Sequence, residues 1–246
     1  MDVKIAPETD RVLLFDLDNT LIECKQYYDE VENAFVKRAA ARTNLPEAFV
    51  RELVQTIDYE SAKLHDGFNS TRFPRSFNAA SLALDVIVGH PANVALAKQE
   101  EVLAALVFSA PYRPYPGALE ALKAMRAAGY RIALVSKGDA TIQHSKIAKH
   151  KLYDVFGYEN IFVVPSKTIP TYQHILGTLE ADPAKSWMIG DSLKDDIHPA
   201  NELGLTTVHI TDSHDPWRWE DQKAQATHTA NTVAELVQHL LDHSDS

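Results

Sequence analysis

Short apolar runs alternate with helical patterns along much of the sequence, and this alternation constrains the fold more than any other feature. The apolar runs each end in a polar loop and occupy residues 12–15, 132–135, 161–164, 187–189 and 205–210. The helical patterns around the later runs occupy residues 117–128, 140–149, 171–179 and 195–203. Strands joined by helical crossovers pair in parallel, and strands of continuous apolarity are buried on both faces. The sequence therefore predicts an α/β core, a Rossmann-like parallel sheet with helices on both faces.

Residues 23–108 have a different pattern, in which helix is favoured and no convincing strand is found. The helix-favouring stretches are residues 31–41, 46–64, 78–87 and 92–107. Prolines, which break helices, follow this segment at Pro111, Pro114 and Pro116. We predict that residues 23–108 form an all-α cap inserted after the first strand of a core made of residues 1–22 and 109–246. The pattern of residues 232–243 predicts a final amphipathic helix.

The charge balance limits the partners. The chain of 246 residues has 34 acidic and 24 basic side chains, a formal net charge of −10, and no block of like charges. Phosphate backbones are bound mainly by clustered lysine and arginine, so we expect neither a nucleic acid polymer nor an anionic membrane as a partner. No apolar stretch reaches the roughly 18 residues of a membrane-spanning helix, and we see no secretory signal. With the single Cys24, these features predict a soluble cytoplasmic protein.

Polar residues follow four of the predicted strands, at the point where each strand ends. In chain order they are Asp16 and Asp18, then Ser136 with Lys137 and Gly138, then Lys167, and last Asp191 with Asp195 and Asp196. Ligands of open parallel sheets bind at the carboxyl ends of the strands, so we expect these residues to meet at one edge. Ser136, Lys137 and Gly138 precede a helix, whose first N–H groups bind anions. The sequence therefore predicts an acidic site beside an anion-binding loop.

In order and spacing these residues resemble the four motifs of the haloacid dehalogenase (HAD) superfamily of hydrolases. The motifs correspond to residues 16–20 (Asp-Leu-Asp-Asn-Thr), Ser136, Lys167 and the stretch that begins at Gly190-Asp191. The resemblance covers residues 11–21 and about 112–211, and the inserted segment is similar to the helical cap of the phosphatase branch. The resemblance implies a Mg²⁺-dependent phosphatase that hydrolyses a small phosphorylated metabolite through an aspartyl-phosphate, with the cap closing over the site.

The chemistry of phosphate esters supports the same roles. Hydrolysis of a phosphate monoester is extremely slow, so an enzyme must supply a placed nucleophile and cancel charge. Asp16 is the expected nucleophile, and Asp18 is the expected acid that protonates the leaving oxygen and the base that later deprotonates water. Ser136 and Lys167 are expected to bind the phosphoryl oxygens, with Lys167 also restraining Asp16. Each step thus has a candidate side chain.

Mg²⁺ prefers oxygen ligands, which the carboxylates of Asp16 and Asp191 and the main-chain carbonyl of Asp18 can supply. Either Asp195 or Asp196 can complete this site, but adjacent residues of a helix point about 100° apart. Asp196 borders the apolar stripe of its expected helix, so we choose Asp196 as the acid that holds the ion's hydration shell. Asp195 suits the start of the helix, where the helix dipole favours a carboxylate.

Other functions are compatible with the same sequence. A phosphosugar mutase would share the core site, and a non-catalytic binding protein would share the fold. A 2-haloacid dehalogenase is disfavoured because Asp18 supplies an acid that dehalogenases of this family lack. Ser136 as a helix cap and Lys167 as a surface lysine are the simplest structural alternatives.

Outside the core motifs, Arg72 and Arg75 lie in an expected polar loop of the cap. We consider both as contacts for a substrate anion, with two solvated arginines as the simpler alternative. His239 and His243 have a zinc-like spacing without a third ligand, which favours a solvated helix face. Trp217 and Trp219 are interpreted as packing over the core rather than stacking on a base.

Overall fold

The computed structural model describes residues 6–64, 69–211 and 224–242 and divides the chain into two compact units. The core unit is Met1–Cys24 with Tyr112–Ser246, and the helical unit is Lys25–Pro111. The two segments of the core unit are hydrogen-bonded near the points where the chain leaves this unit and returns to it. There the Glu23 N–H donates to the Arg113 carbonyl at 2.7 Å. The predicted tryptophan packing, at Trp217 and Trp219, lies outside the described residues.

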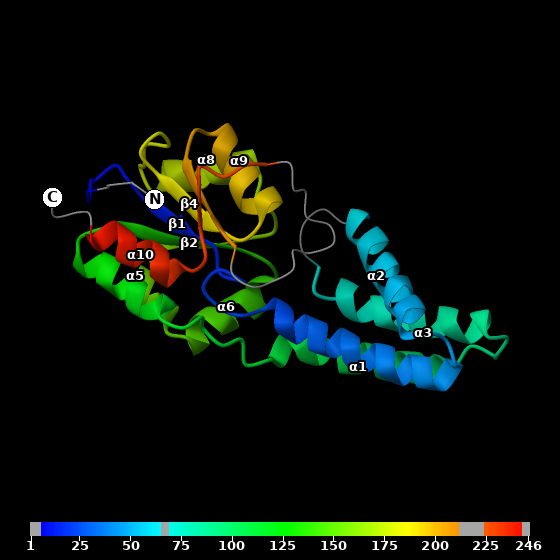
Figure 1. Ribbon diagram of the computed structural model, residues 1–246. Coiled ribbons are helices and arrows are strands. Elements are labelled where there is room, and N and C mark those ends of the chain that lie inside the picture. The colour runs from blue at the N-terminus through cyan, green and yellow to red at the C-terminus, as the bar shows by residue number, and fades with distance from the viewer. Residues whose placement is uncertain (1–5, 65–68, 212–223, 243–246) are drawn as a thin grey trace. The chain divides into compact units, whose positions relative to one another are not determined.

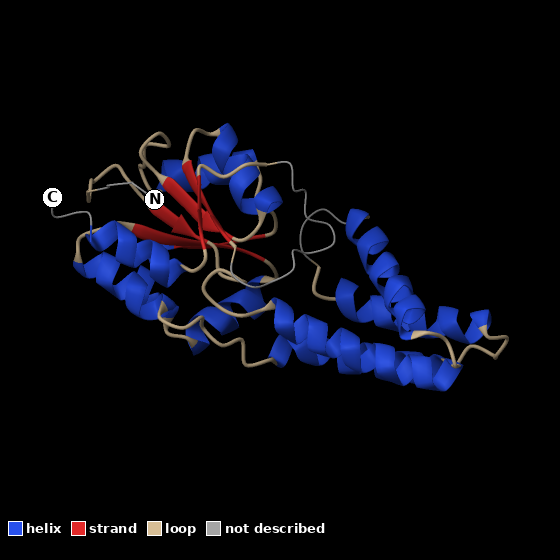
Figure 2. Ribbon diagram, in the orientation of Figure 1, coloured by secondary structure: helices blue, strands red, loops and turns tan. Residues whose placement is uncertain are grey.

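The core unit contains a parallel sheet of six strands in the order β3-β2-β1-β4-β5-β6 (Figure 2). The strands are β1 (Leu13–Phe15), β2 (Ile132–Lys137), β3 (Ile161–Val164), β4 (Trp187–Gly190), β5 (Thr206–Ile210) and β6 (His228–Ala230). In register, Phe15 lies opposite Leu134 of β2 and Ile189 of β4. The strand order reverses direction between β1 and β4, which is where open α/β sheets bind their ligands.

Helices cover both faces of this sheet, with α8 and α9 on one face and α5, α6 and α10 on the other (Figure 1). The helical elements of the core unit are α5 (Ala118–Ala127), α6 (Ala140–Lys149), α7 (Leu152–Phe156), η2 (Tyr158–Asn160), α8 (Ile169–Thr178), η3 (Leu193–Ile197), α9 (His198–Glu202) and α10 (Val233–Asp242). The prediction of an α/β core with a parallel sheet is confirmed. One detail is wrong: the expected single helix 195–203 is a π-helical turn, η3, followed by α9.

Side chains of β1 pack on both faces, as its continuous apolarity predicts. Leu14 packs into a cluster with Tyr172 and Ile175 of α8, whereas the Phe15 ring lies 6.4 Å from that of Phe156 in α7. Burying a leucine or phenylalanine side chain contributes about 1.5–3 kcal/mol. Burial on both faces therefore fixes β1 at the centre of the sheet.

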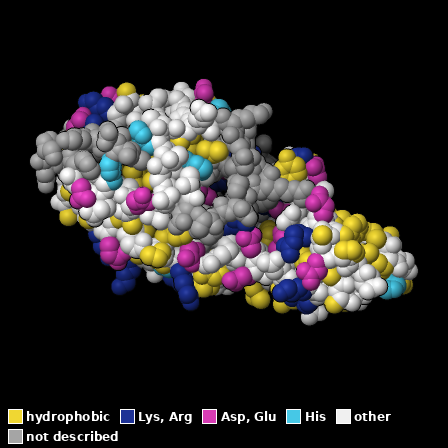
Figure 3. Space-filling model, in the orientation of Figure 1, with side chains coloured by type: hydrophobic (Ala, Val, Ile, Leu, Met, Phe, Trp, Pro, Cys, Tyr) yellow, Lys and Arg dark blue, Asp and Glu magenta, His cyan; other side chains and the backbone are white. Residues whose placement is uncertain are grey.

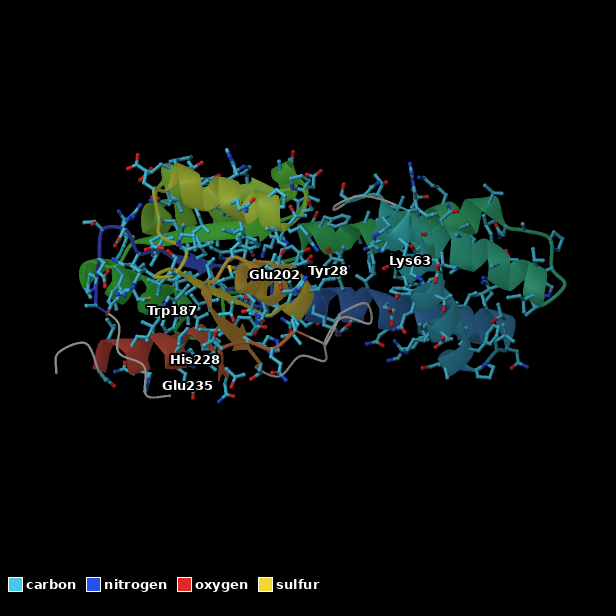
Figure 4. The ribbon with its side chains drawn as sticks, turned by 90° about the horizontal axis from the view of Figure 1, so that it is seen from above. Tyr28, Lys63, Trp187, Glu202, His228 and Glu235 are labelled. Carbon is cyan, nitrogen blue, oxygen red and sulfur yellow. The ribbon has the colours of Figure 1, made fainter. Side chains whose placement is uncertain are left out.

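Strand β6 and helix α7 are absent from the sequence-based prediction. Strand β6 consists of three residues, His228, Thr229 and Ala230, and these do not form an apolar run. The ring of His228 stacks on Trp187 of β4, with centroids 5.9 Å apart (Figure 4). This short edge strand is therefore held by pairing with β5 and by a tertiary ring contact, neither of which has a local sequence signal.

The helical unit comprises α1 (Lys25–Thr43), α2 (Glu47–Lys63), α3 (Arg72–Ile87), α4 (Val94–Ala105) and η1 (Leu106–Ser109). Its core includes Phe35, Phe73 and Phe77, whose neighbouring rings lie 5.0 and 4.8 Å apart at their centroids. Helix α3 begins six residues earlier than the expected stretch 78–87. The reason is Pro74: it lies in the first turn of α3, where a missing N–H costs no helical hydrogen bond.

Charged and hydrophobic side chains are both exposed on the helical unit (Figure 3). Among its described residues, the exposed large hydrophobic side chains are those of Phe49, Leu64, Val86, Ile87, Val94, Val102 and Leu106. Within the described part of the chain, no helix combines the length and the apolarity needed to cross a membrane.

Candidate active site

The loop after β1 places two acids at the carboxyl edge of the sheet. The N–H of Asp16 donates to the Ile189 carbonyl of β4 at 2.9 Å, which fixes the loop to the neighbouring strand. Asn19 then turns the chain with a φ of 63°, a left-handed conformation that asparagine tolerates. Its side chain accepts a hydrogen bond from the Cys24 N–H at 3.1 Å. Local backbone geometry therefore sets the positions of Asp16 and Asp18.

Lys167 lies between two buried carboxylates. Its Nζ is 2.5 Å from Oδ1 of Asp16 and 2.5 Å from Oδ1 of Asp196. Lys167 follows β3 and Asp196 lies in η3, so three different strand ends supply this triad. A buried lysine paired with two carboxylates is retained in its charged form because each partner offsets the cost of removing the charge from water.

Asp196 is fully buried and is held through both carboxylate oxygens. Oδ1 accepts from Lys167, and Oδ2 accepts from the Ser192 N–H at 3.1 Å. Gly190, at the end of β4, leaves the room that Asp196 occupies, since a Cβ there would overlap the Asp196 carboxylate. π-Helical turns such as η3 are rare and are found frequently at functional sites. The absence of a side chain at Gly190 thus admits Asp196 to the site.

Replacing Gly190 with alanine is expected to displace Asp196 and lower kcat/KM by at least about 10-fold, with an overpacking cost of about 1–3 kcal/mol in stability. The matched control is Gly177→Ala in α8, where an added Cβ meets nothing within 4 Å. Phosphatase assays and thermal melts of both variants provide the measurement. Wild-type activity and stability in Gly190→Ala would contradict the prediction that activity depends on the position of Asp196.

Three carboxylates form a cluster at the centre of the site. Asp16, Asp191 and Asp196 each offer an oxygen, and these atoms lie within 4.8 Å of one another. In the described ranges this is the one group of three or more potential ligands close enough to share an ion. Like charges at this separation repel, and oxygen donors suit Mg²⁺. The donor set therefore fits the predicted cofactor.

The charge state of the cluster reflects burial. Burial raises the pKa of Asp16 to about 7, although Lys167 acts to lower it, and Asp196 raises it further. Burial also raises the pKa of Asp196 against the opposing effect of Lys167. For Lys167, burial acts to lower the pKa, but the charges of Asp16 and Asp196 outweigh it and hold that pKa well above its ordinary value. Burial thus disfavours the charged forms of Asp16 and Asp196, and a bound cation would favour them.

The expected phosphate-binding loop follows β2, and Ser136 is buried there beside the acid site. Helix α6 is capped by Asp139, whose side chain accepts from the Ile142 N–H at 3.2 Å, so Ser136 is not its cap. The prediction for Gly138 needs correction, because its N–H donates to the Val164 carbonyl of β3 at 3.0 Å. Pairing with the adjacent strand therefore occupies the N–H expected to bind phosphate.

The side chain of Lys137 forms an ion pair with Asp195. Both groups are part-exposed, with side-chain exposures of 33% and 23%. The N–H of Asp195 also donates to the Ser192 hydroxyl at 3.0 Å, which caps η3. Asp195 is thus engaged at the start of its turn, whereas Asp196 joins the carboxylate cluster. A role for Lys137 in binding phosphate stays a prediction.

Asp18 contacts two residues that the sequence reasoning missed. Lys146 Nζ lies 2.8 and 3.0 Å from the two carboxylate oxygens of Asp18, and Gln143 Nε2 donates to Oδ2 at 2.9 Å. Burial acts against the charge of Lys146, but Asp18 outweighs it and the pKa of Lys146 is raised. Both residues lie on α6 beside buried Ile147. Polar residues at the inward positions of an amphipathic helix were the available signal.

Cys24 is buried next to this group. Burial and the nearby charge of Asp18 raise the pKa of its thiol well above the usual value. The thiolate is the nucleophilic form of cysteine, so burial and a raised pKa both disfavour reaction at Cys24.

Arg72 and Arg75 lie in the first turn of α3, not in the expected loop. Arg72 forms an ion pair with the buried Asp58, which also accepts a hydrogen bond from Ser76 at 3.0 Å. Arg75 is exposed. The structure thus gives Arg72 a partner inside the helical unit, and a substrate contact for either arginine stays a prediction.

Comparison with known proteins supports the interpretation from the motifs. The model of the haloacid dehalogenase-like hydrolase family matches residues 11–204. A glyceraldehyde 3-phosphate phosphatase of Pyrococcus abyssi is 27% identical over 206 residues, which cover 80% of each chain. A second protein of that name, from Methanocaldococcus jannaschii, is 22% identical over 233 residues, which cover 92% of this chain and 94% of the relative.

Solved structures show the same fold. A haloacid dehalogenase-like family hydrolase from Xanthomonas campestris has a TM-score of 0.73 at 20% identity, covering 98% of this chain and 95% of its own. The 2-haloacid dehalogenase of Pseudomonas syringae has a TM-score of 0.55 at 15% identity, covering 94% and 98%. The family match spans the strand ends that supply Asp16, Ser136, Lys167 and Asp191. As the motifs predict, the chain belongs to the haloacid dehalogenase-like hydrolase family.

Proposed function

We propose that this protein is a Mg²⁺-dependent phosphatase that hydrolyses a small phosphorylated metabolite through an aspartyl-phosphate on Asp16. One observation carries the proposal: Asp16 is clustered with Asp191 and Asp196 and is paired with Lys167, while the carboxylate of Asp18 is engaged by Lys146 and Gln143. The two acids of this loop thus have different partners, as their separate roles in the proposed reaction require. The chain is a phosphoric monoester hydrolase of its family.

The reaction has two steps. Asp16 attacks phosphorus and forms the aspartyl-phosphate, while Asp18 gives a proton to the leaving oxygen. Water then attacks the phosphorus, Asp18 takes the proton of that water, and inorganic phosphate leaves. Lys167 is placed to hold Asp16 and to bind a phosphoryl oxygen, and Ser136 donates its hydroxyl to another.

Asp16, Asp191 and the main-chain carbonyl of Asp18 would hold Mg²⁺, with Asp196 orienting its hydration shell. The two oxygens of Asp196 are already engaged by Lys167 and the Ser192 N–H, which favours this indirect role. When bound, Mg²⁺ neutralises the negative charge that otherwise keeps a carboxylate away from a phosphate dianion.

Mg²⁺ is expected to raise the melting temperature of the wild-type protein, because it binds the folded carboxylate cluster and not the unfolded chain. At 100 times its dissociation constant the ion adds about 2.7 kcal/mol, a shift of roughly 5–10 °C for a chain of this size. Asp191→Asn should abolish the shift, and Asp195→Asn should retain it. Thermal melts with Mg²⁺ and with a chelator test this, and equal shifts in wild type and Asp191→Asn would contradict the assigned ligands.

The substrate class is a phosphate monoester of a small metabolite, and the relatives named glyceraldehyde 3-phosphate phosphatase make triose phosphates the first candidates. The deciding experiment measures phosphate release from triose, sugar and nucleoside monophosphates and p-nitrophenyl phosphate, with and without Mg²⁺. We expect Mg²⁺-dependent release from at least one small monoester. An absence of release from every ester, in protein that is folded and metal-loaded, would contradict the proposal.

A further inference from the structure

Among the described residues, the carboxylate within hydrogen-bond distance of the buried Lys146 is that of Asp18. The side chain of Lys146 is 6% exposed, and its Nζ lies 4.3 Å from the centre of the Tyr112 ring and 3.9 Å from Sγ of Cys24. A ring face and a neutral thiol cannot balance a full charge, so Asp18 provides the balancing anion. Removing a charge from water is costly, and this placement therefore ties Lys146 to the acid of the proposed reaction.

Gln143 connects the same acid to the phosphate-binding hydroxyl. Its Nε2 donates to Oδ2 of Asp18 at 2.9 Å and to Oγ of Ser136 at 2.5 Å. Once Asp18 has given up its proton, its carboxylate only accepts hydrogen bonds, so the amide nitrogen of Gln143, and not its oxygen, must face this form of Asp18. Because Ser136 Oγ accepts from Gln143, the hydroxyl proton of Ser136 is left to donate to a phosphoryl oxygen.

The backbone is shaped around Gln143. A Cβ at Gly138 would lie 2.8 Å from Cγ of Gln143, so a glycine at this position leaves the room that the Gln143 side chain occupies. Gln143 is itself buried, at 2% exposure. The loop that was expected to bind phosphate through Gly138 thus makes room for a second side chain that serves Asp18 and Ser136.

We propose that Gln143 and Lys146, one turn apart on α6, are positioning residues for Asp18 in the phosphatase reaction. Lys146 contacts both carboxylate oxygens of Asp18, and Gln143 links one of them to Ser136. This inference rests on the proposed function. When Asp18 passes its proton to the leaving oxygen, negative charge grows on its carboxylate, and the N–H groups of Lys146 and Gln143 stabilise that charge.

The test compares phenyl phosphate with p-nitrophenyl phosphate, which have similar shapes but leaving groups of different basicity. Lys146→Met should lower kcat/KM about 10- to 100-fold for phenyl phosphate, as expected for loss of a charged hydrogen bond, and less than about 3-fold for p-nitrophenyl phosphate. Lys146→Arg, which keeps the charge, should recover part of the loss. The matched control is Lys149→Met, because Lys149 is an exposed lysine on the same helix.

Gln143→Met tests the second contact and keeps the ion pair, so it also serves if Lys146→Met does not fold. It should show the same dependence on the leaving group and should weaken inhibition by inorganic phosphate by about 3- to 10-fold, since Ser136 loses its fixed orientation. An unchanged inhibition constant for phosphate would overturn the link through Ser136. In the Asp18→Asn background, Lys146→Met should add less than about 2-fold, because both changes remove one interaction.

These experiments distinguish failure of the positioning role from failure of the proposed function. Equal losses for both substrates in Lys146→Met and Gln143→Met, with an active wild type, would overturn the positioning role and leave the phosphatase proposal standing. A wild type that hydrolyses neither ester with Mg²⁺ would contradict the proposed function, and the positioning role with it.

Discussion

Asp16→Asn should abolish turnover and leave the fold intact. The amide is nearly isosteric with the carboxylate, but it lacks the charge and nucleophilicity needed to attack phosphorus. We expect a loss of at least about 1,000-fold in kcat, or ~4 kcal/mol in activation free energy, for every phosphate ester. Steady-state assays on the best substrate and on p-nitrophenyl phosphate measure the loss, and circular dichroism and thermal melts follow the fold.

The control for Asp16→Asn is Asp10→Asn, the same substitution just before β1. Asp10 and its partner Lys185 are both part-exposed, and their ion pair lies outside the carboxylate cluster, so the structure gives Asp10 no place in the site. Asp10→Asn should keep wild-type kcat. If Asp16→Asn retained more than about a tenth of the activity, equivalent to less than ~1.4 kcal/mol, Asp16 would not be the nucleophile.

Asp18→Asn should give the second largest effect, and its size should depend on the leaving group. General acid catalysis contributes about 10²–10⁴-fold, and only a basic leaving oxygen needs the proton. We therefore expect kcat/KM for phenyl and alkyl phosphates to fall by this factor and kcat/KM for p-nitrophenyl phosphate to fall by only a few fold. The measurement must use kcat/KM, because this parameter reports the step in which the leaving group departs.

The second step gives Asp18→Asn an independent signature. Without the base that activates water, the aspartyl-phosphate should accumulate, and p-nitrophenol should appear as a burst followed by slow turnover. Stopped-flow absorbance follows that burst. Equal losses of kcat/KM for all leaving groups, without a burst, would show that Asp18 acts through the metal or the local fold instead.

The sheet was predictable because its central strands β1, β2 and β4 are buried, and burial on both faces requires the continuous apolar runs that the sequence shows. The polar residues at the ends of these runs then meet at one edge by topology alone. The sequence therefore predicts that Asp16, Lys167 and Asp191 lie together, and the structure groups Asp16 with both. By contrast, β6 is held by strand pairing and by the Trp187–His228 ring contact, and neither leaves a local pattern.

Side-chain networks that cross the sheet edge were harder to predict. Gly138 suggested an anion-binding N–H, but the register of β2 against β3 gives this N–H the Val164 carbonyl as its partner. Gln143 and Lys146 looked like ordinary polar residues of a helix, because their partner Asp18 lies more than a hundred positions away in the sequence. Such contacts depend on which face α6 turns to the site, and tertiary packing decides that.

Asp196, and not Asp195, joins the carboxylate cluster, but for a reason other than the helix pattern of the sequence. Asp196 was preferred because it borders the apolar stripe of an expected α-helix, and the structure does place it with Asp16 and Asp191. The turn is π-helical, however, so the assumed 3.6-residue geometry does not apply to it. Room at Gly190 and the contacts to Lys167 and Ser192 provide the physical reason for its position.

The most direct test of the central claim is to trap the phosphorylated enzyme and locate the phosphoryl group. Wild-type protein is mixed with Mg²⁺ and a substrate, quenched in acid within milliseconds and treated with borohydride, which reduces an acyl phosphate to an alcohol. Peptide mass spectrometry should find homoserine at position 16 only when substrate is present, and more of it in Asp18→Asn. Reduction at another carboxylate, or unmodified Asp16 in protein quenched during turnover, would contradict the account.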